Sequence, residues 1–302
     1  MQAYRDVPEQ FDAWDIDRTF EDQVFEIDGL VKAEVVETGP YRAALRFEWR
    51  YEASRIVEVV SLEAEGRALE FDSFIDWREH NTMVKAAFPL AVRTADCDAE
   101  IQFGHVTRPT HANTSWDQAR FESPMHRWVS LCEDGFGVAL LNDCKYGYDA
   151  RDTTIRLTLL RSPTYPWPEA DQGEHRFRYA IMPHDGLGSV SLAAEAFNHP
   201  LMPVAGSGDG STAKLTPPFS VDNDAIAVES VKRAEDGRGL VVRLWERRGA
   251  RQNARLTLDT AVKKAREVDL LEDPVVDLCP EAGILALGFA PFEIKTLKLE
   301  RE

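Results

Sequence analysis

The sequence lacks the features that would assign it to several large classes of protein. Its four cysteines form no CxxC pair and are too few for a dense disulfide framework, so we expect reduced thiols. No stretch approaches the roughly 18 consecutive apolar residues that a membrane-spanning helix needs. The N-terminus also has no apolar signal core. These absences predict a soluble, cytoplasmic protein.

Basic residues are scarce relative to acidic ones. The chain of 302 residues has 35 Lys and Arg against 52 Asp and Glu, a net charge of −17. Because this surplus repels phosphate backbones and anionic lipids, we expect neither a nucleic acid nor a membrane as partner. A neutral sugar as ligand is compatible with this negative net charge. No GxSxG, P-loop or GxGxxG motif occurs, so nothing supports a serine nucleophile or nucleotide binding.

Metal-binding and acid/base patterns are also weak. The seven histidines form no HxH, HExxH or Cys/His cluster, so we expect no zinc site within this chain. His175 and His184 are predicted to satisfy hydrogen bonds at strand ends. A retaining glycosidase needs two carboxylates roughly 5 Å apart, but an acidic chain offers close pairs by chance, and a solvated face is the simpler interpretation. The closest pairs in sequence are Asp76 with Glu79, Glu133 with Asp134, and Asp149 with Asp152.

Alternation of apolar and polar residues predicts strands over most of the chain. The short apolar run Gly137–Asn142 is typical of a strand buried on both faces. Apolar and polar residues alternate in segments 154–159 and 177–181, which predicts one buried and one solvent-exposed face for each strand. Leu45–Tyr51 alternates strictly and predicts the clearest half-buried strand. Strands joined by turns without helices favour a large antiparallel sheet.

The composition changes at Gly206–Ser211, where glycine and serine predict a linker or a long loop. We divide the chain into a β super-sandwich with an acidic, aromatic lead-in (1–205), a linker (206–218) and a small β-sandwich (219–302). In the last part Asp236–Gly239 predicts a hairpin turn. The best helix candidate is the short segment 189–197. The predicted fold class is therefore all-β.

Several blocks of the sequence, in order, resemble the C-terminal β region of family 38 glycoside hydrolases, the class II α-mannosidases. The blocks are Asp12–Asp17 (DAWDID), Phe103–Asp117 (FGHVTRPTHANTSWD), Gly137–Asp149 (GVALLNDCKYGYD), Leu159–Pro163 (LLRSP) and Asp171–Phe177 (DQGEHRF). The resemblance implies a large antiparallel β super-sandwich, galactose-mutarotase-like, followed by a small C-terminal β-sandwich.

The resemblance also implies a function. In that family the zinc ligands, the aspartate nucleophile and the acid/base carboxylate lie in an N-terminal α/β barrel, whose His-x-Asp zinc motif is absent here. The chain would then be a non-catalytic part that packs on the catalytic barrel and supplies part of the wall of the α-mannoside pocket, while Zn²⁺ belongs to the complete enzyme. Such a part, alone, would be inactive and would expose an apolar docking face larger than a few hundred Å². Homo-oligomerisation stays open.

Two blocks contain the residues that match the pocket loops of the family. They are Arg108, Asn113 and Asp117 in the first block, and Asp143, Lys145, Tyr146 and Tyr148 in the second. Eukaryotic members carry Arg-Gly near Lys145, so the role of this lysine departs from the family pattern. A structural ion pair for Arg108 and simple packing for Tyr146 stay open. Trp116 and Trp128 are interpreted as buried structural tryptophans rather than sugar-stacking ones.

Two other functions stay open. A stand-alone carbohydrate-binding, lectin-like module would use Trp116, Tyr146 and Tyr148 as an aromatic platform. An independent hydrolase would use one of the carboxylate pairs. Either would act on a sugar without any other polypeptide, which distinguishes both from the non-catalytic part of a larger enzyme.

Overall fold

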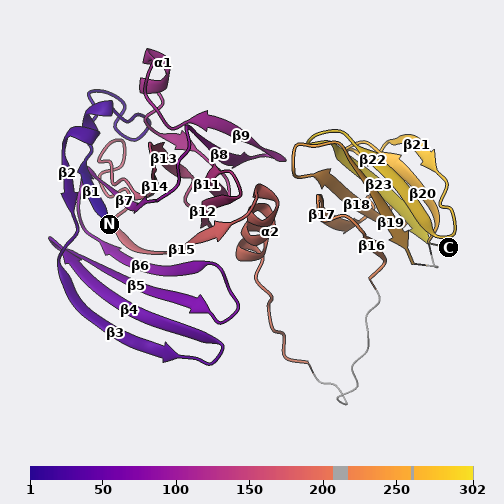
Figure 1. Cartoon of the computed structure of the whole chain (residues 1–302), viewed down its shortest axis with the longest axis horizontal. Coiled ribbons are helices and arrows are strands. Elements are labelled where there is room, and N and C mark those ends of the chain that lie inside the picture. The colour runs from indigo at the N-terminus through magenta and orange to yellow at the C-terminus, as the bar shows by residue number, and fades with distance from the viewer. Residues whose placement is uncertain (207–216, 260–261, 302) are drawn as a thin grey trace. The chain divides into compact units, whose positions relative to one another are not determined.

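The computed structural model describes residues 1–206, 217–259 and 262–301. The chain divides into two compact units (Figure 1). The first comprises Met1–Ile101 and Val106–Pro200, and the second Gln102–His105 and Leu201–Glu302. All strand pairings in the described residues are antiparallel, and the predicted all-β fold is confirmed. The predicted linker over 206–218 lies largely outside the described residues.

A nine-stranded sheet forms one layer of the first unit, in the order β3-β4-β5-β6-β15-β12-β11-β8-β9. Its strands are β3 (Leu30–Thr38), β4 (Arg42–Tyr51), β5 (Ser54–Glu63), β6 (Leu69–Trp77), β15 (Gly173–His184), β12 (Phe136–Asn142), β11 (Trp128–Glu133), β8 (Asp96–Ile101) and β9 (Gly104–Pro109). The strand predicted over Gly137–Asn142 is β12. It lies between β11 and β15, and all its residues from Gly137 on are buried except the half-buried Val138.

A six-stranded sheet forms the second layer, in the order β10-β13-β14-β7-β1-β2. Its strands are β10 (Ser123–Pro124), β13 (Gly147–Arg151), β14 (Thr154–Leu160), β7 (Thr82–Pro89), β1 (Gln2–Arg5) and β2 (Val24–Glu26). In β14 the predicted alternation is confirmed, since Ile155, Leu157 and Leu159 are buried. The two layers enclose one apolar core, in which the rings of Phe71 (β6) and Phe88 (β7) lie 5.7 Å apart.

The strand expected to be the clearest half-buried one, β4, is covered over only part of its length. Trp49 and Tyr51 pack against the core between the layers, as the alternation predicts. Leu45, on the same face, is 44% exposed. Alternation identifies the apolar face of a strand, but the layer that covers this face comes from other parts of the chain.

The helices are short. The predicted helix 189–197 is confirmed as α2 (Leu187–Asn198), whose Val190, Ala194 and Phe197 pack in a small cluster on the nine-stranded sheet. The other helices of the described residues are η1 (Arg18–Asp22) and α1 (Ser115–Gln118). The polar residues of 108–117 predict a long loop, and α1 begins within it. None of the helices within the described ranges is long and apolar enough to cross a membrane.

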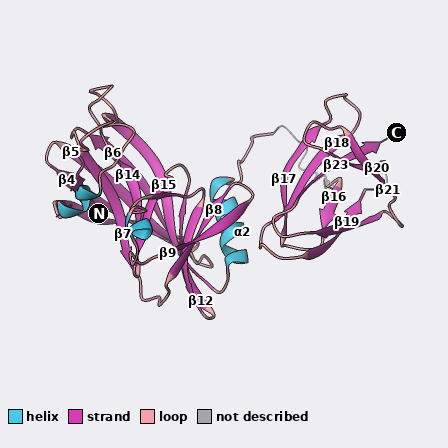
Figure 2. Ribbon diagram, turned by 90° about the horizontal axis from the view of Figure 1, so that it is seen from above, coloured by secondary structure: helices cyan, strands magenta, loops and turns pink. Residues whose placement is uncertain are grey.

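The second unit contains two smaller sheets, in the orders β16-β19-β22 and β17-β18-β23-β20-β21 (Figure 2). Their strands are β16 (Phe219–Val221), β17 (Ile226–Arg233), β18 (Leu240–Glu246), β19 (Gln252–Leu258), β20 (Val262–Val268), β21 (Pro274–Leu278), β22 (Ile284–Phe289) and β23 (Ile294–Arg301). The hairpin predicted at Asp236–Gly239 joins β17 and β18. The apolar residues of 268–271 predict a further strand there, and this prediction is wrong, because β20 ends at Val268.

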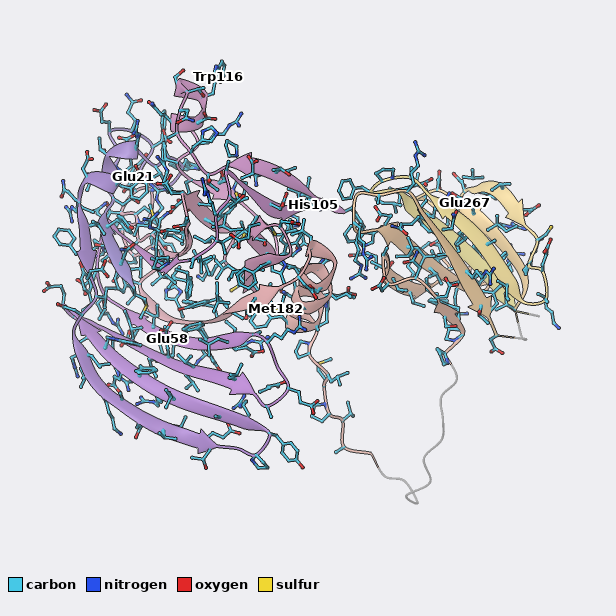
Figure 3. The ribbon with its side chains drawn as sticks, in the orientation of Figure 1. Glu21, Glu58, His105, Trp116, Met182 and Glu267 are labelled. Carbon is cyan, nitrogen blue, oxygen red and sulfur yellow. The ribbon has the colours of Figure 1, made fainter. Side chains whose placement is uncertain are left out.

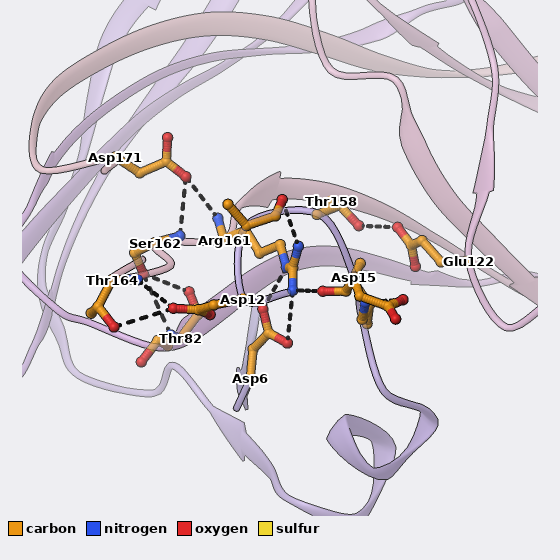
Figure 4. Close-up of polar contacts among 12 residues, drawn as sticks. Asp6, Asp12, Asp15, Thr82, Glu122, Thr158, Arg161, Ser162, Thr164 and Asp171 are labelled. Carbon is orange, nitrogen blue, oxygen red and sulfur yellow. Dashed lines mark hydrogen bonds and ion pairs between the residues drawn. The ribbon is translucent and has the colours of Figure 1, made fainter. Parts of the chain in front are cut away.

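The lead-in before β2 is fixed to the first unit by polar contacts (Figure 4). Arg161 forms an ion pair with Asp6, which is 1% exposed, and burial raises the pKa of this carboxyl. Asp12 Oδ2 accepts the N–H groups of Thr164 and Tyr165 at 2.7 and 3.0 Å. These bonds join the lead-in to the proline-rich segment after β14.

We expect the aromatic residues of the lead-in to pack on a neighbouring sheet or domain, and within the first unit Phe20 is the one that is buried. Phe20 is 4% exposed and its ring lies 5.3 Å from that of Tyr4 on β1. Phe11, Trp14 and Phe25 are each more than half exposed. Within the first unit, polar contacts therefore fix most of this segment.

Candidate functional site

A pocket on the first unit brings together three of the seven predicted site residues. Arg108 from β9, Asp117 from α1 and Tyr148 from β13 all line it. His111 and Asp149 contribute to the same lining. We call this site the Arg108 pocket. Its residues come from three segments separated by tens of positions in the sequence, so only the fold brings them together.

Arg108 and Tyr148 form the polar floor of the Arg108 pocket. Arg108 Nη1 donates to Tyr148 Oη at 3.0 Å, and the guanidinium carbon lies 5.9 Å from the centre of the tyrosine ring. Tyr148 is 1% exposed, and burial raises its pKa. The Sγ atom of Cys97 lies 3.7 Å from Tyr148 Oη. Tyr148 therefore holds the guanidinium in place and offers no ring face to a ligand.

Asp117 has a structural role in addition to its place in the pocket. Thr114 caps α1, and Asp117 Oδ2 accepts the Thr114 N–H at 3.0 Å and its hydroxyl at 2.8 Å, a capping box. These bonds lower the pKa of the Asp117 carboxyl, so it is ionised at neutral pH. His111 Nδ1 lies 3.6 Å from it. The side chain of Asn113 is exposed and does not line the pocket.

The prediction for the two tryptophans is half wrong. Trp128 is 2% exposed, as expected. Trp116 is 77% exposed and points outward from α1 (Figure 3). A four-residue helix with no buried residue has no apolar face against which an indole could pack, which explains the difference.

Asp143, Lys145 and Tyr146 follow β12 and do not line the Arg108 pocket. Asp143 Oδ1 accepts the N–H of Arg178, and its other oxygen lies 3.5 Å from the guanidinium. The ammonium of Lys145 lies 4.7 Å from the ring centre of Phe177. Tyr146 is 56% exposed. The predicted group is thus split into three pocket residues and a second set whose members hold the loop or face solvent.

Asn142 shapes that loop, and our sequence interpretation missed it. The residue is fully buried. Its Nδ2 donates to the His126 carbonyl at 2.7 Å, and its Oδ1 accepts the N–H of Lys145 at 2.8 Å. An asparagine at the end of an apolar run is the signal that could have identified it, since such a side chain can bond the backbone two or three residues on.

A buried ionic network next to the Arg108 pocket was also missed. Lys85 of β7 is fully buried and pairs with Glu122 and with Asp149, whose Oδ2 lies 2.8 Å from Nζ. Arg156 donates to Asp149 Oδ1 at 2.7 Å, and Glu122 accepts the hydroxyl of Thr158. Burial raises the pKa of Glu122. We call these five residues the Lys85 network.

The Lys85 network contains Asp149, one of the carboxylates that the sequence offers as a candidate acid/base pair. Asp149 is not on a solvated face, because its side chain is 11% exposed and bound to two cations. A carboxylate neutralised in this way is a structural group and is not available as a nucleophile. Of the other pairs, Asp76 forms an ion pair with Arg78, and Glu79 accepts the hydroxyl of Ser54.

His184 and Ser130 lie in contact but do not form a nucleophile with its base. His184 Nδ1 accepts the N–H of Gly186 at 3.2 Å, so the proton is on Nε2, which donates to Ser130 Oγ at 2.7 Å. A base would have to accept from the serine instead. Burial lowers the pKa of His184. His184 and His175, whose Nε2 lies 2.9 Å from the carbonyl of Asp171, both satisfy local hydrogen bonds as predicted.

A zinc ion does not fit the side chains of the described ranges. No three His, Cys, Asp or Glu residues converge there in a way that could hold a metal. Zinc sites in proteins use three or four such ligands.

Comparisons with known proteins agree across the whole chain. The model of the glycosyl hydrolases family 38 C-terminal domain matches residues 1–169, and that of the family 38 C-terminal beta sandwich domain matches residues 225–297. The chain is 39% identical to alpha-mannosidase 2C1 of Homo sapiens and 34% identical to alpha-mannosidase G of Dictyostelium discoideum. These matches cover 98% and 95% of this chain but 29% and 28% of those relatives.

A solved structure shares the fold. The crystal structure of an alpha-mannosidase from Enterococcus faecalis V583 matches 99% of this chain and 38% of that one, with a TM-score of 0.83 at 19% sequence identity. The likeness extends over both units and shows the all-β architecture. Together, the family models and the relatives show that this chain belongs to the C-terminal region of glycosyl hydrolase family 38.

Proposed function

We propose that this chain is the non-catalytic C-terminal part of a zinc-dependent α-mannosidase, an enzyme that hydrolyses terminal α-D-mannosides. Family membership supports the proposal, and so does the chain's span of about 29% of its human and mouse relatives. In this proposal the rest of the enzyme carries the catalytic barrel and its zinc, and this chain packs on it. A cytoplasmic location and homo-oligomerisation stay predictions.

The Arg108 pocket is the part of the chain that we propose faces the sugar. A guanidinium has five N–H donors and Tyr148 accepts from one nitrogen, so Arg108 retains donors for sugar hydroxyls. Asp117 is ionised, and only its Oδ2 has bonding partners among the described residues, so Oδ1 can accept from a hydroxyl. Donor and acceptor on one wall complement a neutral polyol.

A chimera tests this function. The matched segment of human alpha-mannosidase 2C1 is replaced by this chain, and hydrolysis of 4-nitrophenyl α-D-mannopyranoside is measured. We expect an active chimera. Arg108→Ala should lower kcat/KM about 10- to 100-fold, because a hydrogen bond to a charged group contributes about 1.5–3 kcal/mol.

Arg93→Ala is the matched control, since Arg93 is exposed and does not line the Arg108 pocket. It should leave kcat/KM unchanged. Turnover by the isolated 302-residue chain would refute the non-catalytic role. A folded but inactive chimera would refute the proposed function, and equal losses in the two arginine variants would count against the proposed pocket.

A second function, a stand-alone carbohydrate-binding module, has weaker support. Trp116 and Tyr146 are exposed as an aromatic platform requires, but Tyr148 is buried and cannot be its third ring. Titration of the isolated chain with mannose and mannobiose tests it. Saturable binding that is lost in Tyr146→Ala would favour the module over the enzyme part.

A further inference from the structure

The two layers of the first unit differ in extent. One has nine strands and the other six. Figure 1 shows β3, β4 and β5 extending below β1, β2 and β7. On these strands five inward-facing apolar residues are exposed or only half-buried, and we call them the open face: Val35, Leu45, Phe47, Val60 and Leu62.

Register shows that the open face continues the core between the layers. Val35 is the partner of Leu45, and Leu45 is the partner of Val60, so the three side chains share one face of the sheet. Trp49 lies on the same face of β4 and packs against the main core. Val35 is nevertheless 63% exposed. The apolar face of β3–β5 therefore extends beyond the layer that covers it.

The opposite face of the same strands is mainly charged, although it also contains Ala44 and Val57, which are 3% and 9% exposed. Arg46 donates to Glu34 and Glu48 at 3.2 and 2.9 Å, and Arg55 donates to Glu48 at 2.8 Å. The Arg55 and Arg46 guanidinium groups hold the pKa of Glu48 at about 2. A sheet that is polar outside and apolar inside needs a second layer inside. A contiguous apolar patch of this kind is unusual on a free monomer.

The six-stranded layer ends at β2. The inward face of β2 is partly exposed, as the inward face of β3–β5 is. Phe25 pairs with Ala3, a fully buried core residue, so Phe25 points inward, yet it is 53% exposed. The Ile27 N–H donates to the carbonyl of Met1, on the β1 side, at 3.0 Å. Because bonding positions alternate along an antiparallel strand, the N–H groups of Val24 and Glu26 point to the free edge.

The free edge of β3 is poorly suited to pairing with a second copy of the chain. Its register to β4 shifts between Leu30 and Lys32 and again between Val35 and Glu37. Bulges and charged side chains on an edge strand are the devices that prevent edge-to-edge pairing. Lys32 pairs with Glu34 at 2.7 Å on this strand. A cover must therefore lie over the open face rather than extend β3.

We infer that further β-strands, supplied by the part of the α-mannosidase that this chain does not span, add to the edge of β2 and cover the open face. The inference rests on the proposed function. A strand paired with β2 would satisfy the N–H groups of Val24 and Glu26 and place its inward side chains beside Phe25, above the open face. A helix could bury the apolar residues but would leave the β2 edge unpaired.

The geometry sets the chemistry of these strands. Neighbouring strands are spaced about 4.8 Å apart in either layer, so covering β3, β4 and β5 takes about three strands. Their inward residues should be apolar, because these side chains would pack against the apolar residues of the open face. The relatives have ample sequence for this, since the chain spans 29% of their length.

Hydrogen exchange on the chimera with human alpha-mannosidase 2C1 and on the isolated chain tests the inference. In the isolated chain the amides of Val24 and Glu26 should exchange almost freely. In the chimera they should be protected by about 100-fold or more, because they join a ladder. Protection of the open face without protection of these two amides would mean that a helix or loop covers it, and would overturn the inference.

A matched pair of variants gives the second readout. Leu45→Lys alters the open face, and Leu271→Lys alters an exposed leucine of the second unit, 82% exposed. In the isolated chain both should unfold at the wild-type temperature. In the chimera only Leu45→Lys should lower the midpoint, by about 5 °C or more, because a lysine is then buried without a partner. Equal midpoints would overturn the inference.

Two further outcomes separate this inference from the proposed function. An active wild-type chimera that tolerates Leu45→Lys and leaves β2 unprotected would overturn the added strands while the α-mannosidase function stands. An inactive chimera whose β2 amides are protected would refute the function alone. If the isolated chain forms a dimer that Leu45→Lys dissociates, a second copy covers the open face, and the inference is wrong.

Discussion

Replacement of Lys85 tests the Lys85 network, which is buried between the six-stranded sheet and the lead-in. The lysine side chain is fully buried, with Nζ 2.8 Å from Asp149 Oδ2 and paired with Glu122. Its ammonium lies 5.1 Å from the ring centre of Phe20 in the lead-in. Lys85→Met keeps most of the side-chain volume and removes the charge. Two carboxylates, 14% and 11% exposed, then lose their common counter-ion.

The expected loss follows from the partners that remain. Removing one member of a buried ion pair costs about 3–5 kcal/mol of unfolding free energy. Arg156 still pairs with Asp149 at 2.7 Å, so the penalty falls mainly on Glu122, and we expect the lower limit, about 3 kcal/mol. At about 2–4 °C per kcal/mol for a unit of this size, the midpoint falls by about 6–12 °C.

The loss should depend on pH. Burial already raises the pKa of Glu122, and removing the ammonium raises it further. A raised carboxyl pKa means that the folded state holds a proton which the unfolded state has released, so stability falls as pH rises above the ordinary value of 4.5. The deficit of Lys85→Met should therefore be larger at pH 8 than at pH 5.

Urea unfolding followed by tryptophan fluorescence measures both effects. Lys32→Met is the control, because Lys32 pairs with Glu34 at 2.7 Å but its side chain is 55% exposed. The control should cost less than about 1 kcal/mol. Losses of equal size in the two variants, or a Lys85→Met deficit that does not change between pH 5 and pH 8, would refute this account of the network.

Two other substitutions test buried polar groups elsewhere in the first unit. Glu58 (Figure 3) is 4% exposed and accepts hydrogen bonds from Ser73 and Tyr179, and burial raises its pKa, so its contribution to the free energy of unfolding falls as pH rises above 4.5. In urea titrations Glu58→Gln should therefore gain stability relative to wild type between pH 5 and pH 8. A stability difference that stays constant over this pH range would contradict this account. Asn142→Ala removes one hydrogen-bond donor and one acceptor from a buried turn and should lower the free energy of unfolding by about 2–3 kcal/mol. Asn113→Ala, at an exposed site, should lower it by almost nothing. Similar urea midpoints for the two variants would show that other contacts hold the turn.

Much of the fold could be predicted because the alternation of apolar and polar residues within a strand shows which of its faces is buried. The alternation in 154–159 identified the buried residues of β14, and the apolar run at Gly137–Asn142 identified a central strand. Turn chemistry located the hairpin at Asp236–Gly239. The extent of each layer was not predictable in this way, because exposure of Leu45 depends on strands far away in sequence.

The candidate site was predictable only in part, for a related reason. The family resemblance singled out Arg108, Asp117 and Tyr148, which converge, but it also singled out Lys145, which packs on a ring away from the pocket. Lys85 stood in an apolar stretch with nothing nearby to indicate its role. Its partners come from segments 37 and 64 residues further along the chain, and no local pattern relates them.

Asp149 has a consequence for how the Arg108 pocket could change over evolutionary time. This one side chain lines both that pocket and a second hollow walled by Tyr4 and Phe20 of the N-terminal segment. A replacement in the lead-in can therefore alter the lining of the Arg108 pocket through Asp149 without any change in Arg108 or Asp117. The proposed preference for mannosides would then be open to change from positions remote from this pocket.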